Sequence, residues 1–230
     1  MPLLGTGLLS VWNDIDAADE AAFNDWYRSE HLAERVGIPG FLRARRYHAL
    51  DAGEAPAYGA LYETETPEVM ASAAYRRRLD DPTPLTVASL ARFRNMHRTV
   101  CRIAASFGRG VGGALAALRP VPPEDQAAAF DRWLGGDALP AVAAEPGIVG
   151  AHLARAVPEL TRNDSVETRA REGPDRIDGR LVLVEAASPE AARRALDRHL
   201  SPDAIARYGV DARTESALYR MIHALEPRDL

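Results

Sequence analysis

The chain of 230 residues contains a single cysteine, no apolar run longer than a strand and no excess of positive charge. The lone Cys101 excludes an internal disulfide and a cysteine-based metal cluster. Its segment, "RTVCRIAAS", is apolar and favours a small core residue over a nucleophile. The first residues lack a basic leader, and no segment is long and apolar enough to span a membrane. We therefore expect a cytoplasmic protein with no membrane partner.

The charge balance is slightly acidic. Lysine and arginine number 28 against 33 aspartates and glutamates, which gives a net charge of −5, and the two signs are interspersed. A nucleic-acid-binding domain normally presents a basic face, so we expect no nucleic-acid partner. The hydrophobic content of 47% and the length suit a globular protein with one large or two small domains.

The chain repeats itself. With a shift of 107 positions, "AAFNDW" at 21–26 aligns with "AAFDRW" at 128–133, and the Pro-Gly pair at 39–40 aligns with the pair at 146–147. Eight of the 24 positions from 21 to 44 are identical. An alanine-rich composition explains some of these identities, but not the phenylalanine, the tryptophan and the Pro-Gly pair in one register.

A second match follows at a different spacing. "YGALYETETPE" at 58–68 aligns with "RLVLVEAASPE" at 180–190, at a shift of 122. The second copy therefore carries 15 extra residues, the difference between the two shifts, within the polar stretch "ELTRNDSVETRAREGPDRIDG". This composition predicts a long hairpin loop over 158–179 that is free to be mobile.

Both copies show one order of signals. An apolar strand (4–12 or 111–119) precedes an amphipathic helix, a Pro-Gly turn, a two-strand hairpin, a second helix that begins at Thr-Pro-Glu or Ser-Pro-Glu, and a last strand. This β-α-β-β-α-β order is that of the ferredoxin-like unit, which leaves one sheet face bare. A second copy covers that face most simply. We therefore predict an α+β protein with two tandem ferredoxin-like repeats, 1–108 and 109–230, packed as a single-chain α/β barrel.

These fused repeats, with "WYRSEHLAERVGIPGFLRARRY" in the first, resemble the dimeric α/β-barrel superfamily. The spacing of Trp26 and His31 is similar to that of its EthD-like group, which stands beside antibiotic-biosynthesis-monooxygenase-like members. The resemblance implies a small bacterial protein of catabolism or biosynthesis, with a ligand between sheet and helices or within the barrel. Members include cofactor-free monooxygenases, muconolactone-type isomerases, polyketide cyclases and haem-using branches, and the fold does not choose among them.

The two copies differ in their polar residues, and only the first carries a candidate site. Five polar residues of the first copy align with Leu134, Ala138, Val142, Gly150 and Ala154 of the second; they are Tyr27, His31, Arg35, Arg43 and Tyr47. On the first helix, Tyr27, Glu30 and His31 share one stripe. On the next strand, alternation predicts that Arg43, Arg45 and Tyr47 share a face with Phe41.

We expect His31 to be the general base or acid, because its ordinary pKa is nearest the working pH. Tyr27 and Glu30 complete the candidate catalytic set, with Tyr27 as a hydrogen-bond donor. An arginine would bind a carboxylate or a developing enolate. The candidate substrate-binding residues are Arg35, Arg43, Tyr47, Trp26 and His97, although the counterpart Trp133 favours a packing role for Trp26.

Two functions are compatible with these residues. The first is a small-molecule enzyme with cofactor-independent acid–base chemistry (an isomerase, cyclase or monooxygenase) on an aromatic or enolisable substrate. The alternative is a non-catalytic ligand-binding or accessory barrel, in which His31 is an exposed helix-end residue paired with Glu30 or Glu34. The six histidines lack metal-ligand spacing, so no metal is expected, and a haem with an axial histidine stays open. With both halves in one chain, we expect a monomeric pseudo-dimer or a homodimer.

Overall fold

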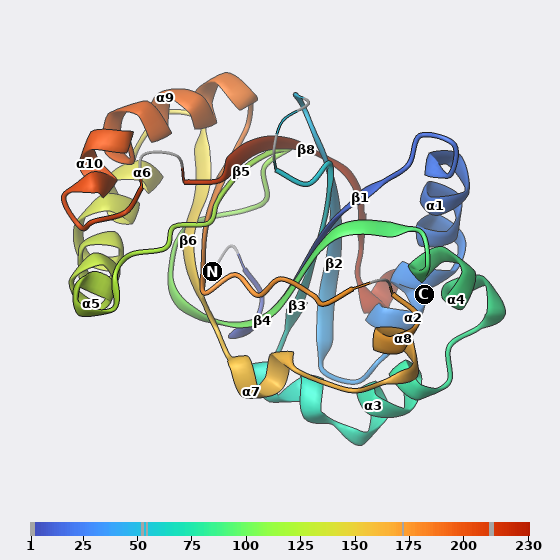
Figure 1. Ribbon diagram of the computed structural model, residues 1–230. Coiled ribbons are helices and arrows are strands. Elements are labelled where there is room, and N and C mark those ends of the chain that lie inside the picture. The colour runs from blue at the N-terminus through green and yellow to red at the C-terminus, as the bar shows by residue number, and fades with distance from the viewer. Residues whose placement is uncertain (1–2, 52, 54, 172, 212–213) are drawn as a thin grey trace.

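The computed structural model describes residues 3–51, 53, 55–171, 173–211 and 214–230 (Figure 1). Over these residues the strands form a closed antiparallel barrel in the order β1-β3-β2-β8-β5-β7-β6-β4. They are β1 (Gly7–Ile15), β2 (Phe41–Ala49), β3 (Tyr58–Thr64), β4 (Phe93–Gly108), β5 (Ala114–Leu118), β6 (Ile148–Ala156), β7 (Arg180–Ala186) and β8 (Ser216–Leu225).

Each half of the chain supplies four adjacent strands. The runs β4-β1-β3-β2 and β8-β5-β7-β6 each have the strand order of a ferredoxin-like sheet, and the pairs β2–β8 and β4–β6 close the barrel. The predicted α+β class and barrel architecture are therefore confirmed. None of the helices in the described part of the chain is long and apolar enough to cross a membrane.

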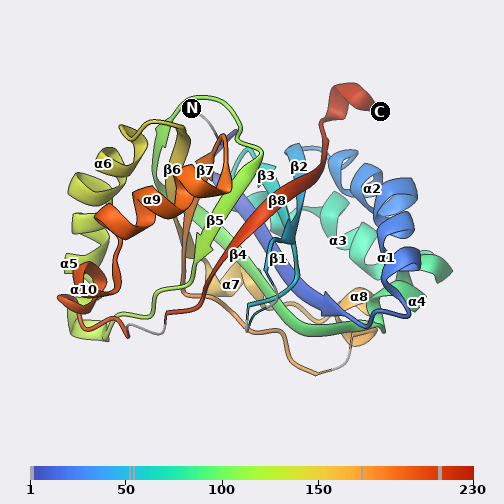
Figure 2. The same ribbon diagram turned by 90° about the horizontal axis from the view of Figure 1, so that it is seen from above.

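Helices of the two halves cover opposite sides of the barrel (Figure 2). The first side carries α1 (Glu20–Trp26), α2 (Leu32–Val36), α3 (Ala73–Asp80) and α4 (Pro84–Leu90), with a short 3-10 turn at Pro67–Ala71. The second side carries α5 (Glu124–Trp133), α6 (Leu139–Ala143), α9 (Pro189–His199) and α10 (Pro202–Ala206). Hydroxyl residues start several of them: Ser188 Oγ accepts from Ala191 N at 3.3 Å before α9, and Thr83 Oγ1 accepts from Thr86 N at 3.0 Å before α4.

Matching irregularities occur in the two halves at the spacing that the sequence repeat predicts. A π-helical segment follows the first helix of each half, η1 (Tyr27–His31) and η3 (Leu134–Ala138), 107 residues apart. Both β2 and β6 have a bulge near the start, and the preceding glycines Gly40 and Gly147 have φ values of 92° and 85°. Glycine adopts this left-handed conformation without strain, so turn geometry requires the repeated Pro-Gly pair.

The insertion in the second half connects the antiparallel strands β6 and β7, and it has secondary structure of its own. It contains α7 (Pro158–Thr161) and α8 (Val166–Arg169), and it crosses to the first half, where α8 lies beside α3 and α4 (Figures 1 and 2). Val100 N donates to Thr161 Oγ1 and Arg98 N donates to Arg176 O, each at 3.0 Å. The early part of β4 is free to donate these bonds because β6 pairs with β4 only from Cys101 onwards.

Side chains fill the inside of the barrel. Its middle is apolar and includes Leu8, Leu61 and Cys101, the predicted core cysteine, and burial raises the pKa of that thiol. At one end Arg45 Nε lies 2.9 Å from Glu63 Oε1, and Arg45 Nη1 lies 2.7 Å from Glu185 Oε2. A second ionic cluster closes the other end.

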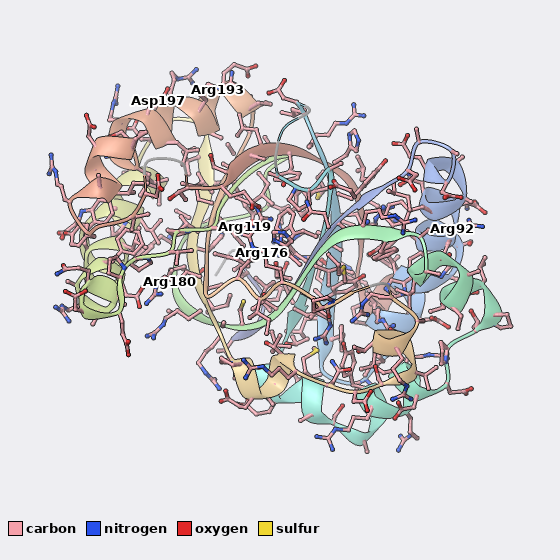
Figure 3. The ribbon with its side chains drawn as sticks, viewed as in Figure 1. Arg92, Arg119, Arg176, Arg180, Arg193 and Asp197 are labelled. Atoms are coloured by element: carbon pink, nitrogen blue, oxygen red, sulfur yellow. The ribbon has the colours of Figure 1, made fainter. Side chains whose placement is uncertain are left out.

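That second cluster is built around Asp178. Its carboxylate accepts from Arg119 Nε at 3.1 Å, while Arg119 and Arg176 both form ion pairs with Glu215 (Figure 3). The Arg119 guanidinium also lies 4.5 Å from the ring centroid of Trp12. In the described part of the chain, ionic clusters therefore lie at both ends of the barrel and packed side chains fill its middle.

Candidate functional site

A small cavity lies between the first-half helices and the outer face of the sheet. Its volume is about 30 Å³, enough for one or two water molecules. Five elements supply polar lining residues: His31 comes from η1, Arg35 from α2, Tyr62 from β3, Arg98 from β4 and Glu167 from α8. The other lining residues are Leu9, Val11, Tyr27, Tyr75, Leu79, Leu90, Phe93, Met96 and Arg171.

The imidazole of His31 is buried, with 7% of the residue exposed. It lies against Trp26 with ring centroids 4.2 Å apart, and the Tyr27 ring meets it edge-on at 5.1 Å. Its Nδ1 has no hydrogen-bond partner among the described residues. Burial, with the nearby positive charges of Arg35 and Arg46, lowers the pKa of His31 well below 6.5, so the ring is neutral.

Arg35 and Glu167 form an ion pair inside the site. Each residue is 3% exposed, and Arg35 Nη2 donates to Glu167 Oε1. Burial acts to lower the pKa of Arg35, but the carboxylate of Glu167 outweighs it, so the guanidinium stays charged. The second terminal nitrogen, Nη1, has no hydrogen-bond partner in the described part of the chain. The first half thus supplies the cation, and the insertion from the second half supplies the anion.

Two phenols and a buried arginine lie close to His31 and Arg35. Burial raises the pKa of both Tyr27 and Tyr62, so both hydroxyls keep their protons and can donate hydrogen bonds. The Arg46 guanidinium lies 3.8 Å from the ring centroid of Tyr27 and also covers Phe23 and Tyr58, at 5.0 and 5.4 Å. Arg46 therefore adds positive charge beside the cavity without belonging to its lining.

Arg43 and Tyr47, two of the predicted substrate-binding residues, do not line the cavity beside His31. The bulge between Phe41 and Arg43 adds one residue to β2 and changes the alternation. Phe41 stays in the core under the helices, while Tyr47 lies in the barrel interior. Arg43 Nη2 lies 2.8 Å from Glu63 Oε2, next to Arg45.

Glu30, Trp26 and His97 lie outside the cavity lining. The Glu30 carboxylate accepts hydrogen bonds from Thr83 and Thr86, at 2.6 and 2.9 Å, at the start of α4. Trp26 Nε1 donates to Thr86 Oγ1 at 3.1 Å, so this indole fixes α1 to α4 while its ring supports His31. His97 Nδ1 lies 3.3 Å from Asp178 Oδ2, in the cluster at the barrel end. These residues position elements around the site.

Sequence reasoning missed Tyr62, Arg98 and Glu167. Tyr62 aligns with Val184 at the shift of 122, so the polar-to-apolar comparison could have found it. Arg98 follows His97 on β4, and alternation turns its side chain to the opposite face. Glu167 lies in the insertion, which has no counterpart in the first copy, so the repeat gave no signal for it.

The corresponding region of the second half is apolar. Leu134, Ala138 and Val142, the counterparts of Tyr27, His31 and Arg35, are buried in its core. At these three aligned positions, the side chains are therefore polar in the first half and apolar in the second. Within the described ranges, no group of three or more histidine, cysteine, aspartate or glutamate side chains is placed to hold a metal ion. A cavity of about 30 Å³ also does not fit a haem beside His31.

No protein-family model and no curated protein sequence matches the chain. Solved structures do. An anthrone oxidase-like protein has a TM-score of 0.64 at 11% identity, covering 97% of this chain and 94% of its own. A candidate monooxygenase from Lactobacillus acidophilus has a TM-score of 0.58 at 9% identity, covering 96% and 97%. A candidate chlorite dismutase has a TM-score of 0.55 at 13% identity, covering 96% of each chain. The likeness is one of fold. It supports the dimeric α/β-barrel architecture over nearly the whole chain.

Proposed function

We propose that the chain is a small-molecule enzyme in which His31 acts as a general base on an aromatic or enolisable substrate, without a bound organic cofactor. The observation that carries this proposal is the buried, neutral imidazole of His31, whose Nδ1 has no partner among the described residues, in a cavity shared with the Arg35 guanidinium. An unsatisfied buried polar atom costs free energy of folding, so its presence at a cavity indicates a functional role.

The chemistry begins with a proton transfer. A neutral imidazole accepts a proton from an acidic C–H or O–H group, and the electron pair stays on the substrate as an enolate or phenolate. Arg35 and the phenols of Tyr27 and Tyr62 stabilise this negative charge. The low pKa of His31 makes the free imidazole a weak base, but an anion that develops beside it stabilises the imidazolium.

Three outcomes are open to such an anion. Return of the proton to another carbon completes an isomerisation, attack on an internal carbonyl completes a cyclisation, and reaction with dioxygen begins an oxidation. Names of the fold neighbours include oxidases and monooxygenases, which supports the third outcome as an analogy of fold only.

The small volume of this cavity favours a second candidate function, a ligand-binding or accessory barrel without catalysis. In that case His31 contributes a hydrogen bond and takes no proton. The two candidates differ in what happens to the ligand, so a substitution that preserves hydrogen bonding but removes the basic nitrogen distinguishes them.

That substitution is His31→Gln. Mass spectrometry of small molecules retained by the purified protein identifies a ligand, and turnover of that ligand is then compared between variants. We expect kcat of H31Q to fall by about 10²- to 10⁴-fold with little change in KM. His199→Gln is the matched control, because His199 lies on the opposite side of the barrel, 2.8 Å from Glu145. A folded H31Q with unchanged turnover excludes the catalytic role and favours the binding barrel.

We further propose that the chain is an EthD-like or antibiotic-biosynthesis-monooxygenase-like member of its fold, and that 1–108 and 109–230 arose by duplication. The π-helical segments 107 residues apart and the matching bulges support the duplication. Because both barrel halves lie in one chain, we propose a monomeric pseudo-dimer or a homodimer.

A further inference from the structure

The cavity beside His31 has more positive than negative charge in its lining. Three arginines line it, Arg35, Arg98 and Arg171, against one carboxylate, that of Glu167. Arg98 donates to Thr161 O at 2.7 Å and to Tyr75 Oη at 3.0 Å, neither of which carries a charge. Arg171 forms an ion pair with Asp175, whose carboxylate oxygen lies 2.7 Å from Nη2 and which does not belong to the lining. A buried space with this balance favours an anionic ligand.

The one carboxylate in the lining belongs to a short helix that has few hydrogen bonds to the helices of the first half. Glu167 lies on α8, a helix of four residues within the insertion. Apart from the ion pair with Arg35, the hydrogen bond between α8 and the first-half helices in the described residues is Val166 N to Asp80 Oδ1, at 3.4 Å. The carboxylate of Glu167 is thus held by its ion pair with Arg35, while Ala170 of the same segment packs against the first-half core.

A route for a ligand runs along the same segment. On the outer side of Leu79 lies a surface groove of about 270 Å³ between α3 and residues 159–165 of the insertion. Leu79 also lines the cavity beside His31. A displacement of α8 from Arg35 would join the groove to the cavity, and their combined volume suits a small aromatic molecule.

We propose that Glu167 occupies, in the closed protein, the place of a carboxylate carried by the substrate, and that an aromatic carboxylate replaces it on Arg35. The insertion then covers the ligand, and the exchange of one carboxylate for another leaves the buried guanidinium paired at both stages. This inference rests on the proposed function for the location of the site, and it adds the substrate class.

Calorimetric titration of 2-naphthoate and of its uncharged analogue 2-naphthamide tests the exchange without any turnover. In Glu167→Gln the competing charge is gone, so we expect 2-naphthoate to bind about tenfold more tightly than to the wild type, and 2-naphthamide to change less than about twofold. The double variant R35Q/E167Q removes both charges and leaves no unpaired buried ion, so it keeps the fold. We expect it to lose the preference for the carboxylate.

An equal gain in affinity for 2-naphthoate and 2-naphthamide in E167Q overturns the proposal, because it means that the substitution only made the site more accessible. So does an E167Q protein that binds naphthoate no more tightly than the wild type, or a double variant that keeps the preference. Should E167Q fail to fold, hydrogen exchange in the wild type decides. Saturating 2-naphthoate is expected to speed exchange of the amides of 165–171, and unchanged exchange overturns the proposal.

The result of the naphthoate-binding test can be distinguished from the result of the turnover test of the proposed function. His31→Gln is expected to bind 2-naphthoate within about threefold of the wild type, because Arg35 holds the carboxylate. An H31Q protein that keeps its turnover refutes the catalytic role of His31 and leaves the carboxylate position intact. A normal loss of turnover in H31Q, with no carboxylate preference in E167Q, refutes the substrate class alone.

Discussion

Replacing Arg45 by methionine tests the ionic cluster at one end of the barrel. Arg45 is fully buried, and it joins Glu63 of β3 to Glu185 of β7 with N–O distances of 2.9 and 2.7 Å. Without it, Glu63 keeps Arg43, at 2.8 Å, but Glu185 keeps only the neighbouring His152 and the amide of Gly112 at 3.3 Å. Removal of one partner of a buried ion pair costs about 3–5 kcal/mol, and we expect R45M to lose this much at pH 7.

The pH dependence separates the charge from the packing. Burial acts to raise the pKa of Glu185, but His152 and Arg45 outweigh it and hold the pKa at about 2, below the ordinary 4.5. This carboxylate therefore stabilises the wild type above pH 4.5, and the contribution is lost as the pH falls towards 2. In R45M that pKa rises, so the difference between the two proteins should shrink by about 2 kcal/mol between pH 4.5 and pH 3, at 1.36 kcal/mol per pKa unit.

Urea unfolding followed by circular dichroism at pH 7, 4.5 and 3 gives both quantities. Arg102→Met is the control, because its 2.6 Å ion pair with Glu68 is about half exposed and should contribute less than about 1 kcal/mol. A deficit in R45M that stays constant down to pH 3 would mean that lost packing, and not the charge on Glu185, accounts for it. A deficit below about 1 kcal/mol at pH 7 would refute the reasoning altogether.

Two further predictions concern the first half. The folded-state pKa of His31 lies below 6.5. As the pH falls below 6.5, His31 therefore takes up a proton in the unfolded chain while it stays neutral in the folded chain. The stability of the wild type relative to H31Q should therefore fall by about 1.4 kcal/mol for each pH unit below 6.5, and equal pH profiles in urea unfolding would contradict the burial of the imidazole. Gly40→Ala should destabilise by about 1–3 kcal/mol, because Gly40 has φ 92° and an added Cβ would lie 2.7 Å from Val69 Cγ2. Gly136→Ala, with open space around it, should be neutral or slightly stabilising, and equal thermal shifts for the two variants would refute the turn argument.

Much of the fold could be predicted because its determinants are local and occur twice. The Pro-Gly turns, the hydroxyl residues before prolines and the alternation of strands each act over a few residues, and their recurrence identified the ferredoxin-like order. The bulge in β2 was not predictable in this way. It depends on how Phe41 and Arg43 pair with β3, and a single extra residue reverses which side chains face the helices.

The candidate site was predicted only in part for the same reason. His31, Tyr27 and Arg35 lie on one continuous helical segment, so their common face follows from helical spacing. Glu167 is 132 positions from Arg35 along the chain, and no local pattern links the two. Long-range partners of this kind depend on how the insertion crosses the barrel, and sequence spacing carries no information about that path.

The crossing of the insertion from one half to the other has a consequence for symmetry. In a barrel made of two identical chains, each subunit's insertion would cover the other's helices, and both sites would have to be alike. A single chain is free of that constraint, since one half can keep the polar helix and the other the segment that covers it. Arg35 and Glu167 lie on different halves of one chain, so separating the halves at position 108 would leave the cation and its covering carboxylate on different molecules.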